Sequence, residues 1–170
     1  MSQSYPSYSY VPGHWPHPFN SPEGHGFKLE LDPSQPLDLV NWNQCEAYTA
    51  GVRLFNAGYY WEAHEAWELV WGRMGKHTLE GQLLQSLIKI AAAAIKIRQG
   101  QSKASRSLLT QSSKHLTKVM ERHTETYAGG LHLAVLERWC RDFRDEVGDV
   151  VANPKEPVET VVPPLKLFAE

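Results

Sequence analysis

The sequence predicts an all-α protein, a single-domain bundle of about five helices with an extended N-terminal arm rich in proline and aromatic residues. Apolar residues recur at helical spacing from about residue 43 to about residue 147, and no segment shows the alternation of a strand. The first forty residues differ, because seven of the eleven prolines lie there. Such proline density excludes a helix or a central strand, so this part of the chain is expected to be extended.

Residues 1–40 are expected to form an arm that packs on the bundle. No charged residue precedes Glu23. The segment is too aromatic for a solvated linker, since its rings favour contact with a neighbouring surface. The aromatic residues are Tyr5, Tyr8, Tyr10, Trp15, Phe19 and Phe27. An unattached tail is the alternative.

Residues 41–150 are expected to form the helical domain, in which polar caps and glycines mark the helix ends. Asn43 and Ser102 are suitable N-caps, and Gly58 is a suitable stop. The Gly129-Gly130 pair separates the last two helices. The predicted helices cover residues 43–57, 59–74, 78–98, 102–123 and 131–147, and residues 151–170, with four prolines, form an extended C-terminal tail.

Composition excludes several classes of protein. Lys and Arg total 17 against 19 Asp and Glu, and this balance excludes a globally basic nucleic-acid binder. The two cysteines, Cys45 and Cys140, exclude a disulfide scaffold and a thiolate zinc cluster and fit a reducing compartment. No stretch approaches the roughly 20 apolar residues that span a bilayer, and no signal peptide is evident. We therefore expect a cytoplasmic protein with no membrane partner.

The predicted second helix carries the most informative residues. On a helical wheel His64 and Glu68 lie one turn apart on the buried side, between Trp67 and Trp71. A carboxylate against aromatic rings loses hydration, so it must find a partner or keep its proton. The pair is therefore the first candidate for a functional site.

The opposite side of the same helix is expected to face water. Glu62 and Glu65 fall there on the wheel, turned away from His64. The simplest interpretation of these two acids is a solvated surface.

A divalent metal is one partner that fits the candidate pair. An imidazole and a carboxylate four residues apart on a helix can bind one cation together, although two ligands alone do not make a metal site. His17 and His25 of the arm are the candidates for further ligands if the arm docks over this helix. The ligand types do not distinguish Zn, Mn, Fe or Ni. The alternative is a structural pair that hydrogen-bonds and pins two helices.

The run from Phe55 to Trp71 resembles a bacterial and archaeal family known as domain of unknown function 309. The family's hallmark is a His, then a Glu four residues on, then a Trp or Tyr three further, which correspond here to His64, Glu68 and Trp71. Residues 84–92 are similar to a second recurring block of the family. The resemblance implies an all-helical fold and a motif that has been suggested to bind metal. It implies no established activity.

The chain departs from the family at two positions. Lys89 stands where Gln is usual, and Lys96 stands where many members have His. If these positions line the site, both departures weaken a histidine-rich metal centre and favour an anionic ligand.

Positive charge is concentrated in residues 81–120, which hold seven Lys or Arg residues and no acid. On the predicted third helix one stripe is polar and contains Gln82, Gln85, Lys89 and Lys96. The stripe is interpreted as a solvated face, or else as a surface for phosphate, nucleotide or RNA. A further alternative is that Lys89 points at Glu68 and neutralises it without a metal.

Three functional interpretations therefore stay open. The first is a small protein that binds a divalent metal at His64 and Glu68, with hydrolytic chemistry in which Glu65 or another carboxylate takes the proton of a bound water. Trp67, Trp71, Gln85 and Lys89 are the residues expected to contact a small-molecule ligand beside it. The second is a non-enzymatic module that binds a protein partner or a second copy of itself. The third is a phosphate or nucleotide binder, although a nucleic-acid partner is disfavoured because no recognisable motif accompanies the stripe.

Overall fold

The computed structural model describes residues 4–28 and 35–168, and it confirms the all-α expectation over these residues. Five α-helices follow one another in this described part of the chain, each within a few residues of its predicted range. Residues 1–3 and 29–34 of the predicted arm, and 169–170 of the predicted tail, lie outside the described residues. The helical elements are a 3-10 turn η1 (Trp42–Gln44), α1 (Glu46–Asn56), α2 (Tyr60–Trp71), α3 (Leu79–Arg98), α4 (Ser102–Arg122), α5 (Leu133–Glu146) and a second 3-10 turn η2 (Val147–Asp149).

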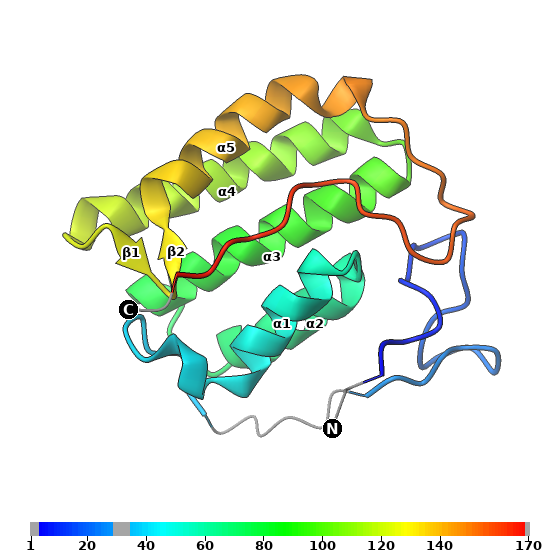
Figure 1. The fold of residues 1–170 in the computed structure, drawn as a ribbon, viewed down its shortest axis with the longest axis horizontal. Helices are drawn as coiled ribbons and strands as arrows, with labels where there is room; N and C mark the ends of the chain where they lie inside the picture. Colours follow the sequence, from blue (N-terminus) through cyan, green and yellow to red (C-terminus); the bar gives the residue numbers. More distant parts are fainter. Residues whose placement is uncertain (1–3, 29–34, 169–170) are drawn as a thin grey trace.

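Helix α3 lies at the centre of the bundle, with α1 and α2 on one side and α4 and α5 on the other (Figure 1). Its large apolar side chains, such as those of Leu83, Leu87 and Ile90, are fully buried. The small side chains of its alanine run let α4 approach closely. The Ser105 hydroxyl of α4 reaches the α3 backbone and donates to the Ala93 carbonyl at 3.0 Å.

A two-stranded hairpin joins α4 to α5, where the sequence predicted only a break. The strands β1 (Tyr127–Ala128) and β2 (Leu131–His132) pair antiparallel across the two glycines Gly129 and Gly130. Both glycines have positive φ, 59° and 74°, which is the geometry that a two-residue hairpin turn requires. A Cβ at Gly129 would lie 2.6 Å from the Tyr48 hydroxyl, so the close packing also requires glycine.

The described part of the arm packs on the start of α2 and on the C-terminal tail. The Tyr59 hydroxyl donates to the Pro6 carbonyl at 2.8 Å, and the Tyr59 ring stacks on Tyr5. The Ser9 amide donates to the Pro157 carbonyl at 2.7 Å. Figure 1 shows the arm and the tail side by side at one end of the bundle.

The guanidinium of Arg98 ties the end of α3 to both segments. Arg98 is almost fully buried, and it donates to the carbonyls of Ser9 at 3.4 Å and Glu156 at 2.6 Å. Its Nε lies 3.5 Å from a carboxylate oxygen of Glu159. These contacts offset the cost of burying a charge and fix the arm and the tail to the same end of the bundle.

The C-terminal tail returns along the bundle and ends beside the hairpin. The side-chain amide of Asn56 makes two hydrogen bonds to the backbone of Leu165, at 2.9 and 2.7 Å. Further along, the Phe168 amide donates to the Gly130 carbonyl at 2.8 Å. Of the described helices, none combines the length and the apolar character needed to cross a lipid bilayer.

Candidate metal centre

Helix α2 is fixed in the bundle by one buried face. Tyr60, Ala63, Trp67 and Val70 are buried at the spacing of an α-helix. The Trp67 indole donates to the Tyr48 carbonyl at 3.2 Å. This anchoring sets the direction in which the remaining side chains of α2 point.

The side chains of His64, Glu65 and Glu68 form a cluster on the open side of α2. Nε2 of His64 lies 3.6 Å from Oε1 of Glu68, and Nδ1 of His64 lies 3.6 Å from Oε1 of Glu65. One potential ligand atom from each of the three residues lies within 4.8 Å of the others. Two carboxylates and an imidazole thus converge on one small volume.

The cluster is more open than the sequence predicted. The Glu68 side chain is 47% exposed and that of Glu65 45% exposed, whereas that of His64 is 22% exposed. The prediction of a buried His64–Glu68 pair is therefore wrong for Glu68. Glu68 lies at the border of the buried face of α2, and the structure leaves that border open to solvent.

The expectation that Glu65 turns away from His64 is also wrong. Glu65 does face water, but its side chain is long enough for the carboxylate to reach back to the neighbouring imidazole. A wheel represents the Cα–Cβ direction alone, so it underestimates the reach of a glutamate.

Glu62 is buried, contrary to the prediction that it faces water. Its side chain and that of His25 are each 2% exposed, and Oε1 of Glu62 lies 3.0 Å from Nε2 of His25. The Tyr10 amide donates to the same oxygen at 3.1 Å. The arm covers this side of α2 and supplies both partners, which a wheel of α2 alone does not reveal.

The two arm histidines predicted as further ligands, His17 and His25, are engaged by the arm and by Glu62, and neither is part of the His64 cluster. Nδ1 of His25 accepts the Phe27 amide at 3.0 Å, so in the neutral ring Nε2 carries the proton and donates to Glu62. Nδ1 of His17 accepts the amides of the two residues Phe19 and Asn20. Neither histidine joins the group of potential ligands that the described residues form around His64.

The four residues expected to contact a ligand beside the cluster have different surroundings. Trp67 is fully buried, so it belongs to the core and cannot touch a ligand. Trp71 is half-buried, and its indole nitrogen has no hydrogen-bond partner within the described residues. Gln85 and Lys89 lie half-buried on α3.

Within the described part of the chain, the surroundings of Lys89 give no sign of a pairing with Glu68. Burial, with the positive charges of Lys118 and Lys89, lowers the pKa of His115 on α4. Among the residues that the structure describes, no ion pair joins Lys89 to Glu68. The alternative in which Lys89 neutralises Glu68 is therefore not observed.

The two cysteines offer no nucleophile for catalysis. Cys45 and Cys140 are both buried and unpaired. Burial raises the pKa of the Cys140 thiol to about 12, and burial also raises the pKa of Cys45. A thiol that stays protonated at neutral pH is unreactive.

The fold and the cluster together define a small helical-bundle protein with an open His–carboxylate site on its second helix. The model of the family described as Domain of unknown function (DUF309) matches residues 48–108, which confirms the family resemblance over this region. The matched region includes all of α2 and α3, and so contains His64, Glu65 and Glu68. No curated protein matches the chain.

Proposed function

We propose that the protein binds a divalent metal ion at His64, Glu65 and Glu68 and uses it for hydrolytic chemistry. The observation that carries the proposal is the convergence of one imidazole and two carboxylates within 4.8 Å. Two carboxylates beside an imidazole favour a dication electrostatically, and nitrogen and oxygen donors suit zinc and the neighbouring divalent metals.

The spacing of the cluster supports a metal better than a structural hydrogen bond. Nε2 of His64 and Oε1 of Glu68 are 3.6 Å apart, which is longer than a hydrogen bond between nitrogen and oxygen. Two ligands of one zinc ion are roughly 3 to 3.5 Å apart, given bonds of about 2.0 to 2.2 Å. Small rotations of exposed side chains are enough to reach that spacing.

Glu65 has three alternative roles in such a centre: orienting the imidazole, binding the ion, or accepting a proton from bound water. Nδ1 of His64 is buried and has no hydrogen-bond partner among the described residues, and Glu65 is the neighbouring carboxylate. If His64 and Glu68 hold the ion, Glu65 orients the imidazole through Nδ1, as carboxylates commonly do beside metal-bound histidines. If Glu65 also binds the ion, the centre has three protein ligands.

The chemistry follows from the openness of the site. A divalent metal held by so few protein ligands keeps positions for water and lowers the pKa of that water toward neutrality. If His64 and Glu68 held the ion and Glu65 did not, the exposed Glu65 carboxylate would be a neighbouring group able to accept a proton from the bound water.

Calorimetric titration of the chelator-treated protein with Zn²⁺, Mn²⁺ and Ni²⁺ tests the proposal. We expect one ion per chain, and we expect His64→Ala and Glu68→Gln each to weaken binding by tenfold or more. His77→Ala and Glu121→Gln are matched controls, because both residues are exposed and lie outside the cluster. Equal binding by all five proteins, or no binding by the wild type, refutes the metal centre.

A second candidate function is supported by the basic surface between α3 and α4. Lys89 and Lys118 both lower the pKa of His115, and in the described part of the chain no carboxylate forms an ion pair with either lysine. A phosphate group would be attracted to this surface. We expect Lys89→Gln to weaken binding of inorganic phosphate or ATP at low salt, and an unchanged titration contradicts this candidate.

A further inference from the structure

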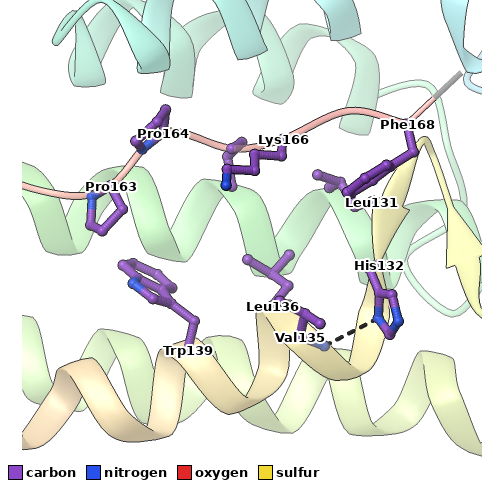
Figure 2. Close-up of a pocket in the computed structure, with 10 residues that line it drawn as sticks. Leu131, His132, Val135, Leu136, Trp139, Pro163, Pro164, Lys166 and Phe168 are labelled. Atoms are coloured by element: carbon purple, nitrogen blue, oxygen red, sulfur yellow. Dashed lines mark hydrogen bonds between the residues drawn. The ribbon is translucent and has the colours of Figure 1, made fainter.

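A groove of about 330 Å³ lies between α5 and the C-terminal tail, on residues remote in sequence from the His64 cluster. Its size is that of the smaller ligand pockets, which begin at about 300 Å³. Figure 2 shows side chains of α5 facing the tail across the groove. The apolar lining comes from both sides, chiefly from Val135, Leu136 and Trp139 of α5 and from Pro163, Pro164 and Phe168 of the tail.

Both walls of the groove are held in place. The tail is fastened by the hydrogen bonds of Leu165 to Asn56 and of Phe168 to Gly130. The Leu165 side chain is 8% exposed and is part of the core. The groove is thus built into the folded chain, although its mouth is open enough to leave Val135 58% exposed.

Lys166 of the tail contributes a positive charge to this largely apolar lining. Figure 2 places its side chain on the tail, across from Leu136. No acid is among the described residues that line the groove, and none of the described carboxylates forms an ion pair with Lys166. His132, the other polar residue of the lining, already accepts the Val135 amide on Nδ1 and caps α5.

We propose that this groove binds a small apolar carboxylate, with its acid group on Lys166 and its hydrocarbon body along Leu136 and Trp139. The hydrocarbon part of such a ligand would cover the apolar side chains of the groove and remove them from water. The unpaired ammonium of Lys166 would favour an acid over a neutral molecule of the same shape. Neither the apolar contact nor the charge contact involves the His64 cluster, so this site is independent of the proposed metal centre.

Octanoate and 1-octanol are a matched pair of probes, because they share a hydrocarbon chain and differ in charge. Lys166 is exposed, so we expect octanoate to bind the full chain up to about fivefold tighter than octanol in calorimetry, the upper end of what an exposed ion pair supplies. We also expect both probes to shift the amide resonances of α5 and the tail. Equal affinities, or shifts confined to other parts of the chain, overturn the proposal.

Substitutions at exposed positions separate the charge from the apolar contact. Lys166→Gln is expected to weaken octanoate binding by up to about fivefold and to leave octanol binding unchanged, and Val135→Glu is expected to repel octanoate in the same selective way. Lys155→Gln is the control, because Lys155 is an exposed lysine of the tail outside the groove. If Lys166→Gln binds octanoate as the wild type does, the proposal fails. A combination of three results also overturns the proposal: the chain forms a dimer in sedimentation, Val135→Glu abolishes that dimer, and octanoate does not bind. The groove would then be occupied by a second copy of the chain.

Discussion

Two histidine–glutamate contacts lie on neighbouring turns of α2, and they differ in almost every physical respect. The side chains of His25 and Glu62 are each 2% exposed and their nearest polar atoms lie 3.0 Å apart, and the Tyr10 amide donates to the same oxygen of Glu62. His64 and Glu68 are partly exposed and 3.6 Å apart, with no hydrogen bond between them. The same residue types thus hold the arm in one place and leave donor atoms available for a ligand in the other.

Burial explains the difference. A carboxylate that the arm seals from water must be hydrogen-bonded, so Glu62 is committed to His25 and Tyr10. A carboxylate that water can reach carries no such penalty, so Glu68 can exchange water for a metal ion. The predictions below remove one member of each contact in turn.

The largest effect is expected for Glu62→Ala. The change leaves the Tyr10 amide and the His25 ring without their acceptor, and each loss of a buried partner costs about 1–3 kcal/mol. We expect the free energy of unfolding in urea to fall by about 2–3 kcal/mol. Glu65→Ala is the matched control on the same helix, and it should change stability by less than about 0.5 kcal/mol. Equal losses for the two variants contradict the comparison.

A smaller effect is expected for His25→Ala, which removes one partner of Glu62 and leaves the Tyr10 amide in place. We expect a loss of about 1–2 kcal/mol, together with faster tryptic cleavage after Lys28 because the arm undocks more often. His14→Ala, a change at an exposed arm histidine, provides the control. Cleavage rates that match the wild type would show that the pair does not hold the arm.

Acidification is expected to act through a third histidine, His115. Its pKa is lowered in the folded protein, so the unfolded chain takes up the proton first as the pH falls below the ordinary value of 6.5. Stability should therefore decrease below about pH 6.5, by less than the full value of about 1.4 kcal/mol per pH unit, because water partly screens this half-buried ring. Urea titrations between pH 7.5 and about 5 measure the slope, and His115→Gln should reduce it. If the unfolding free energy of His115→Gln depends on pH as strongly as that of the wild type, the acid sensitivity comes from other groups.

The smallest effect on stability is expected for His64→Ala in metal-free protein. His64 makes no hydrogen bond with its carboxylate neighbours, so only the packing of its partly buried ring is lost, and the free energy of unfolding should fall by less than about 1 kcal/mol. With Zn²⁺ present, only the wild type should gain melting temperature, since an ion that binds the folded state stabilises it. A large loss without metal would mean that His64 is structural, as His25 is.

The sequence predicted the helices well because their signals are local. Glycines such as Gly58 and the periodic apolar residues of α3 define elements whatever the tertiary context. The hairpin at Gly129 and Gly130 was missed because two-residue strands carry no alternating pattern.

The candidate site was predicted only in part, because its environment depends on distant segments. The wheel of α2 brought His64 and Glu68 together, as the structure does. It misplaced Glu62, since nothing in α2 indicates that His25, 37 residues earlier, would cover it. The exposure of Glu68 depends on which other segments cover α2, and local spacing does not encode that.

Diffraction from crystals soaked in Mn²⁺ or Zn²⁺, with an anomalous difference map, tests the central claim most directly. The account predicts one strong peak on α2, bonded to a ring nitrogen of His64 and an oxygen of Glu68, and no peak at the His25–Glu62 pair. A map with no peak at His64 under saturating metal, or with the ion at Glu62 instead, would contradict it.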